Sequence, residues 1–169
     1  MTIAGDWDLA ARQLVELQTE ATGELLQQAV DRAFNGDIGR LARFVAALAA
    51  ALPPGTRVYL RGSAVAGASY RSHEPFDARG PGSSDLDIVV CGPEAMALFS
   101  DDGFYIPGIN SRPLCDTERD VAPRLDAARS AAQAMAGRPV SIQAMDEAFL
   151  NIRSAAQETP FIPLAVVSG

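Results

Sequence analysis

The chain has 169 residues, a net charge of −7 and a pI near 4.6, and 48% of its residues are hydrophobic. A chain of this length can bury a sizeable core as one domain. The acidic balance argues against a broad electrostatic footprint on nucleic acid, leaves room for a local basic groove, and favours a small molecule or a protein as the partner.

No apolar run approaches the roughly 18–20 residues that span a membrane. The first residues lack the basic and apolar regions of a signal peptide, so we expect a cytoplasmic protein without membrane contact, with export by another route as the open alternative. The two cysteines, Cys91 and Cys115, do not form a metal-binding pattern. Cys91 ends an apolar run and is typical of a small buried hydrophobic residue.

The N-terminal part predicts two amphipathic helices. Apolar residues recur at helical spacing across residues 6–34, where Asp6 or Asp8 is the candidate N-cap. Asp37 can cap a second helix, which ends at a proline-rich turn. We expect both helices to cover a sheet, with a partner-binding role for the first helix as an alternative.

The residues that suggest a function lie on or next to two predicted strands. Residues 58–61 alternate in a strand-like pattern and lead into Gly62-Ser63, where glycine lets the backbone approach a ligand closely. A helix starting at Ser63 would favour an anion at its N-terminus; the plain alternative is that Ser63 only caps that helix. Asp85 and Asp87 lie two apart on the next strand, so both carboxylates face one side and repel unless a cation lies between them. Hard oxygen ligands in this arrangement suit Mg²⁺, which shares its shell with water and phosphates.

A long polar segment separates these two motifs. It contains Arg71, His73 and Arg79, and arginine is suited to bidentate contact with phosphate. A segment of this length is either functional, clamping phosphate or an acceptor, or a loop whose charges are simply solvated. The single histidine is more typical of an ordinary loop residue than of a catalytic one. Ser83 and Ser84, directly before the acidic pair, can reach phosphate or metal-bound water.

The rest of the chain completes an α/β (α+β) pattern, a mixed sheet covered by helices. In order, it predicts a short helix at 93–99, a short strand at 104–106, a helix capped by Asp120 and ended by Gly137, a strand at 138–145 and a helix to about residue 157, before an apolar end that forms a strand or a docked arm. The inner face of the helix before Gly137 is expected to carry Leu125, Ala128, Ala132 and Met135. We expect one domain, 1–169, made of a helical pair at 1–52, a core at 57–145 and a C-terminal helix and tail at 146–169.

Gly62-Ser63 followed by Asp85-x-Asp87 on a hydrophobic strand resembles the signature of the polymerase-β-like nucleotidyltransferase superfamily. The resemblance spans residues 57–91, with a weaker architectural match to residue 145. In that superfamily the Gly-Ser turn holds a nucleoside triphosphate, and the carboxylates hold two Mg²⁺ ions together with a third carboxylate on a later strand. Here 21 residues lie between Ser63 and Asp85, a longer segment than in the short members of the superfamily.

The third carboxylate is the second departure from the pattern. On the strand at 138–145, the position that the superfamily fills with an acid is occupied by Ser141 or Gln143. The amide oxygen of Gln143 can bind Mg²⁺ but carries no charge. Asp146 and Glu147 follow the strand, but Asp146 has the wrong parity unless a bulge shifts it. Asp116 or Asp120 folding over the site is the remaining alternative.

The resemblance implies an enzyme that uses Mg²⁺ to transfer a nucleoside monophosphate from a nucleoside triphosphate to an unknown acceptor, a small molecule or a protein rather than bulk nucleic acid. Asp85 and Asp87 are then the catalytic metal ligands, with Gln143 as a third. The residues expected to contact the nucleotide are Gly62, Ser63, Arg71, Arg79 and Ser84. The alternatives are a binding module that kept this fold and lost turnover, such as one partner of a toxin–antitoxin pair, and a structural protein with an accidental match.

Overall fold

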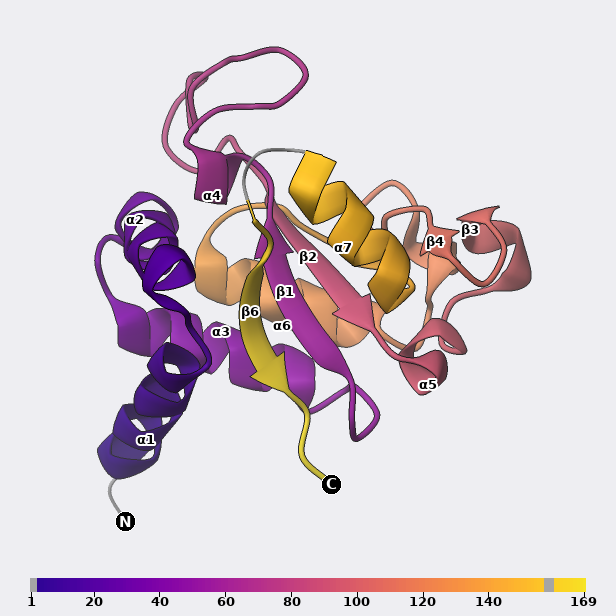
Figure 1. Ribbon diagram of the computed structural model, residues 1–169, viewed down its shortest axis with the longest axis horizontal. Coiled ribbons are helices and arrows are strands. Elements are labelled where there is room, and N and C mark those ends of the chain that lie inside the picture. Colours follow the sequence, from indigo (N-terminus) through magenta and orange to yellow (C-terminus); the bar gives the residue numbers. More distant parts are fainter. Residues whose placement is uncertain (1–2, 157–159) are drawn as a thin grey trace.

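A mixed four-stranded sheet forms the centre of the fold (Figure 1). In this computed structural model, which describes residues 3–156 and 160–169, the strand order is β5-β2-β1-β6. β1 runs antiparallel to β2 and β6, and β2 runs parallel to β5. The strands are β1 (Arg57–Arg61), β2 (Leu86–Cys91), β5 (Val140–Ala144) and β6 (Ile162–Val166), and a separate hairpin pairs β3 (Phe104–Ile106) with β4 (Asn110–Ser111).

Helices cover both faces of this sheet. α3 and α6 lie against one face and α7 against the other (Figure 1), which confirms the expected α/β class. No helix in the described part of the chain is long and apolar enough to cross a membrane. The helices are α1 (Ile3–Glu16), α2 (Glu20–Phe34), α3 (Ile38–Ala49), α4 (Ser63–Ala66), α5 (Pro93–Met96), α6 (Asp126–Ala136) and α7 (Glu147–Ala156), with 3₁₀ turns at Asp101–Gly103 and Arg119–Val121.

The period of two along β2 divides the interior into two apolar clusters. Leu86, Ile88 and Val90 belong to the large cluster that includes residues of α2, α3 and α6, whereas Val89 and Cys91 belong to a smaller one with Leu150 of α7. Almost every side chain of this strand is therefore buried on one face or the other. The exception is its second residue, an aspartate on the α7 face, which lies at the end of the sheet where apolar cover stops.

The N-terminal helical prediction needs two corrections. Residues 6–34 form two helices, because the chain breaks after α1 and restarts at Thr19, whose Oγ1 accepts a 3.2 Å hydrogen bond from the Thr22 N–H. The Thr22 hydroxyl accepts from the Thr19 N–H at 2.8 Å, which completes a reciprocal cap. α1 begins at Ile3, so neither Asp6 nor Asp8 is its N-cap.

The prediction for the helix before Gly137 is correct at its end and wrong at its start. Gly137 ends α6 in a left-handed conformation, but Asp120 lies in a 3₁₀ turn and does not cap α6. Met135, expected on the inner face of this helix, is 41% exposed. Arg129 is fully buried on that helix instead. The Arg129 guanidinium donates to two carboxylates at 2.9 Å and to a backbone carbonyl of β5 at 3.1 Å, so its charge is compensated and α6 is fixed to the sheet.

Other expected elements are confirmed. The Asp37 side chain accepts from the Arg40 N–H at 3.1 Å and caps α3. Cys91 is buried, and both cysteines are free thiols. The apolar end of the chain forms β6, an edge strand of the sheet, where Pro163 is tolerated because edge positions need no ladder donor on their outer side.

Candidate active site

The corner between β1 and α4 is built on Gly62. Its φ of 88° and ψ of −157° belong to a region of backbone space that only glycine adopts readily. Gly62 is the N-cap residue of α4, so Ser63 is the first residue of that helix and not its cap. A helix does start at Ser63, as the sequence suggested, but α4 is only a single turn.

The glycine corner is in direct contact with the acidic strand. A Cβ atom placed on Gly62 would lie 2.3 Å from Oδ2 of Asp87, which leaves no room for any side chain. β1 and β2 are paired so that Arg61 lies opposite Asp87. Antiparallel pairing therefore places the two motifs of the sequence against each other.

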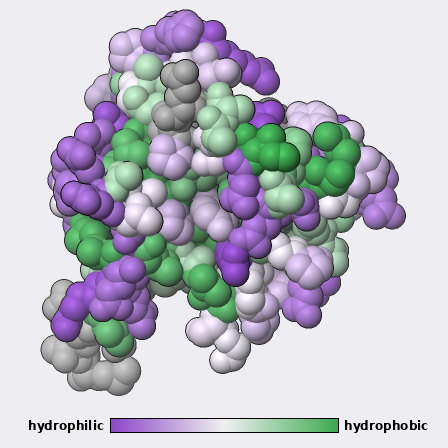
Figure 2. Space-filling view, viewed as in Figure 1, coloured by the Kyte–Doolittle hydropathy of each residue, from purple (hydrophilic) through white to green (hydrophobic). Residues whose placement is uncertain are grey.

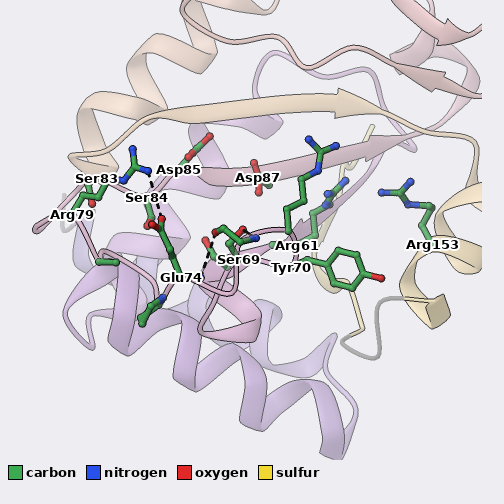
Figure 3. Close-up of a pocket in the computed structure, with 16 residues that line it drawn as sticks. Arg61, Ser69, Tyr70, Glu74, Arg79, Ser83, Ser84, Asp85, Asp87 and Arg153 are labelled. Atoms are coloured by element: carbon green, nitrogen blue, oxygen red, sulfur yellow. Dashed lines mark hydrogen bonds and ion pairs between the residues drawn. The ribbon is translucent and has the colours of Figure 1, made fainter.

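Both acidic residues line one cavity of about 510 Å³. Asp85, directly before β2, is exposed, and Asp87 is partly buried. Figure 3 shows Asp87 between Asp85 and Arg61. The strand begins one residue later than predicted, at Leu86, so Asp85 precedes it, but both carboxylates still line the same cavity.

Burial makes the charge of Asp87 costly. Loss of solvent raises the pKa of this carboxyl group, and the nearby Asp85 raises it further. The Ser141 hydroxyl, on the neighbouring strand β5, donates a 2.9 Å hydrogen bond to Oδ1, which favours the charged form, as does the guanidinium of Arg61. The burial penalty exceeds these two stabilising contributions, so a cation at this position would be favourable.

Arginine side chains surround the two acids although the chain as a whole carries a net charge of −7. Arg71 and Arg79 of the long segment line the cavity, as expected from the sequence, and so do Arg61 and Arg153. Arg61 is the last residue of β1 and follows the same alternation as Tyr59, so its face was predictable. Arg153 belongs to α7, and only the packing of that helix on the sheet brings it here (Figure 3).

The Arg61 side chain is held in place but not fully paired. Burial lowers its pKa, and the guanidinium carbon lies 5.5 Å from the centre of the Phe161 ring. Nη1 donates to Oε1 of Gln143 at 3.3 Å, whereas Nε is buried without a partner in the described structure.

The long segment is a folded loop. The charged side chains of Arg71, Glu74 and Arg79 are exposed, and Asp77 is the partly buried one that joins the loop to the rest of the fold. Arg138 donates from Nη1 to Oδ1 of Asp77 at 2.8 Å and from Nη2 to Oδ2 at 3.1 Å. Asp77 also accepts from the N–H groups of Gly82 and Ser84, and the Arg138 guanidinium stacks 4.6 Å from the Phe76 ring centre. This pair fixes the loop to the start of β5, while the loop's outer surface is hydrophilic (Figure 2).

Removing this ion pair is expected to loosen the loop. The Arg138 hydrogen bonds lower the pKa of Asp77 from 3.8 to about 2, so the pair stabilises the fold above pH 3.8 and this stabilisation is lost as the pH falls towards about 2. Asp77→Asn should therefore speed trypsin cleavage after Arg71 and Arg79 at neutral pH. Thermal unfolding should show a lower Tm than wild type at pH 7, with the difference shrinking as the pH approaches 2.

Glu74→Gln is the matched control for this experiment. Glu74 pairs with Arg79 in the same loop at 3.7 Å, but the two side chains are 52% and 80% exposed, so the pair contributes little. Its cleavage rate should match wild type. The role of the pair would be contradicted if trypsin cleaved the loop of Asp77→Asn no faster than that of wild type. A Tm difference that persists unchanged at pH 2 would also contradict it.

The side chain of Gln143 forms its hydrogen bonds outside the cavity. Its amide nitrogen donates to Oδ1 of Asn110 at 3.2 Å and to the Ser111 carbonyl at 2.8 Å, and its amide oxygen accepts from Arg61. Gln143 does not line the cavity; Ser141 is the residue of β5 beside the buried carboxylate. In residues 3–156 and 160–169, no group of three or more His, Cys, Asp or Glu side chains is placed to hold a metal.

The other candidate acids have structural partners. Asp146 accepts from two N–H groups in the first turn of α7, which makes it a helix cap. Asp116 pairs with Arg129, and Glu147 pairs with an arginine of β1. Neither these residues nor Asp120 line the cavity. The third acid that does line it is Glu74 of the long segment, which pairs with Arg79 at 3.7 Å.

Comparison of the chain with protein-family models, with curated proteins and with solved structures finds no match. The function must therefore be inferred from the side chains of the cavity. They combine the carboxylates of Glu74, Asp85 and Asp87, a group that suits a hard cation, with four guanidinium groups, which suit phosphate oxygens.

Proposed function

We propose that the chain is a Mg²⁺-dependent nucleotidyltransferase that transfers a nucleoside monophosphate from a nucleoside triphosphate to an acceptor hydroxyl group. The observation that carries this proposal is the contact of the Gly62 corner with Asp87, in a cavity that also contains Asp85 and four arginines. The resemblance of these motifs to polymerase-β-like nucleotidyltransferases supports the same reaction.

The carboxylates fit a magnesium ion that shares its ligands with the substrate. Mg²⁺ is commonly bound by one or two carboxylates, with water and phosphate oxygens completing its shell. Asp85 and Asp87 supply these two carboxylates, and Oδ1 of Asp87 is oriented by Ser141. A second ion, which the resemblance implies, would need a third carboxylate. Glu74 also lines the cavity, but it pairs with Arg79 and forms no metal-binding group with the two aspartates in the described chain, so we assign the positive charge on that side to Arg61.

In the proposed reaction, the acceptor oxygen forms a bond to the α-phosphorus, and the bond to the bridging oxygen of the β-phosphate breaks. Pyrophosphate leaves, and the proton of the acceptor is released to water. Arg71, Arg79 and Arg153 would neutralise the triphosphate, and Gly62 would let the backbone lie against it. Mg²⁺ bound at the site supplies polarisation of the phosphate and stabilises charge on the leaving oxygen.

A nucleotide-binding module without turnover, such as one member of a toxin–antitoxin pair, is the second candidate. The lack of an acid on β5 favours it, because Gln143 carries no charge and its amide is engaged by Arg61, Asn110 and Ser111. Such a module would still bind a nucleoside triphosphate with Mg²⁺ but would release no pyrophosphate.

Turnover with each labelled triphosphate separates these candidates. The protein is incubated with Mg²⁺ and each nucleoside triphosphate in turn, with and without cell extract as a source of acceptor, and pyrophosphate release and label transfer are followed. We expect release and transfer that depend on Mg²⁺ and are lost in Asp85→Asn but kept in Asp102→Asn, an exposed acid away from the cavity. Binding without release favours the module, and absence of Mg²⁺-dependent binding contradicts both candidates.

A further inference from the structure

A second, smaller cavity of about 210 Å³ lies beside the first. The two cavities share Arg61, Gly62, Ser69 and Tyr70, so they meet at the corner between β1 and α4. A ligand bound at the acidic pair can therefore extend into the second cavity past these shared residues.

The linings of the two cavities differ in chemistry. Beyond the shared residues, the smaller cavity is lined by Ala66, Ala68, His73, Pro160 and Phe161, which offer rings and methyl groups. No acidic side chain lines it in the described part of the chain, whereas the main cavity is lined by charged groups from β2, α7 and the long loop. One ligand that fits both would carry a polyanion at one end and a flat, weakly polar group at the other.

Tyr70 is positioned for contact with such a flat group. The turn that carries it is closed by hydrogen bonds from the Ser69 N–H to the Glu74 carbonyl at 2.8 Å and from the His73 N–H to the Ser69 carbonyl at 2.9 Å. Its side chain is 69% exposed although it lines both cavities. Figure 3 places the Tyr70 ring on the Arg61 side of the site, away from Asp85.

We propose that the smaller cavity binds the base of the nucleoside triphosphate, which stacks on Tyr70, while the triphosphate stays in the main cavity. This inference rests on the proposed function and deepens it by assigning the base a site. Stacking of a base on an aromatic side chain contributes about 1–3 kcal/mol and tolerates any base, because every base has a flat π-face. Recognition through Tyr70 therefore implies binding of several nucleoside triphosphates with similar affinity.

Equilibrium binding to two probes tests this assignment. The dissociation constants of the four ribonucleoside triphosphates and of inorganic tripolyphosphate are measured with Mg²⁺ for wild type and for Tyr70→Ala. We expect Tyr70→Ala to weaken binding of the nucleotides about tenfold, at the lower end of measured stacking effects, and to leave tripolyphosphate binding unchanged. Tyr105→Ala is the matched control, since Tyr105 is 62% exposed on β3 and lines neither cavity.

The outcomes separate this inference from the proposed function. The base site is overturned if Tyr70→Ala binds nucleotides as tightly as wild type does, or if its affinity falls equally for nucleotides and tripolyphosphate. Either result leaves the proposed phosphate site unaffected. A second variant, His73→Ala, should also weaken nucleotide binding and leave tripolyphosphate binding unchanged. The opposite pattern counts against the base site. Wild-type protein that binds neither probe with Mg²⁺ overturns the proposed function together with the base site.

Discussion

Asp87→Asn is expected to lower Mg²⁺-dependent nucleotide transfer by roughly 100-fold or more, because loss of one preorganised electrostatic interaction in an active site commonly costs that much. Asparagine keeps the shape of the side chain and the hydrogen bond partner Ser141, but removes the negative charge that would hold the cation. The rate of pyrophosphate release at saturating Mg²⁺ and triphosphate measures the effect.

The same substitution is expected to stabilise the fold at neutral pH. The pKa of Asp87 is raised in the folded chain, so the folded state prefers the protonated acid and ionisation destabilises it as the pH rises through the raised pKa. Asp87→Asn should therefore have a higher Tm than wild type at pH 7, and the gain should vanish below the ordinary pKa of an aspartate. Mg²⁺ should raise the Tm of wild type and not that of the variant.

Asp85→Asn provides the contrast for this prediction. Asp85 lines the same cavity but is exposed, so its loss should impair transfer without a comparable gain in Tm. Asp102→Asn, on the exposed surface, should change neither property. Full turnover in both Asp85→Asn and Asp87→Asn would show that these acids do not hold the metal.

Gly62→Ala is expected to abolish transfer as severely as loss of the carboxylate. The added Cβ would lie 2.3 Å from Oδ2 of Asp87, so either the corner shifts or the carboxylate rotates away from its position. The φ of 88° adds a strain of about 1–3 kcal/mol for any residue with a Cβ. Pyrophosphate release, the Tm and the Mg²⁺-induced shift in Tm measure the three consequences.

Gly55→Ala separates the two causes. Gly55 has a φ of 86°, but nothing lies within 4 Å of a Cβ placed there. Its substitution should lower the Tm through backbone strain and leave both transfer and the Mg²⁺ effect intact. If Gly62→Ala retained transfer at the level of Gly55→Ala, the contact between the corner and the acidic strand would have no functional meaning.

Some of these features follow from the sequence alone because they depend on local spacing. A period of two places Asp87 on one side of β2 and buries Leu86 and Ile88 on the other. The same period assigned Val140 and Ile142 of β5 to the core. The glycine after β1 was expected to let the backbone approach a ligand, whereas the contact that excludes a side chain there is with Asp87, which only the tertiary structure shows.

The predicted N-terminal helix boundaries were wrong because side-chain hydrogen bonds, and not apolar spacing, set the break. The break between α1 and α2 is set by hydrogen bonds between Thr19 and Thr22, which the apolar spacing of residues 6–34 does not reveal. Arg129 fills a buried position of α6 because Asp126, one turn earlier, and Asp116, outside the helix, compensate its charge, whereas periodicity ranks an arginine as exposed.

The sequence by itself determined the order of the motifs, the faces of the strands and the α/β class, since these follow from backbone geometry and side-chain polarity over a few residues. Only the tertiary structure decided which charges meet at the site. Arg153 reaches the cavity because α7 packs on that face, the pair of Asp77 with Arg138 closes the long loop, and Ser141 rather than Gln143 lies beside the buried acid because β5 pairs with β2 in that register. Such contacts join segments distant in the chain, and local pattern carries no information about their distance.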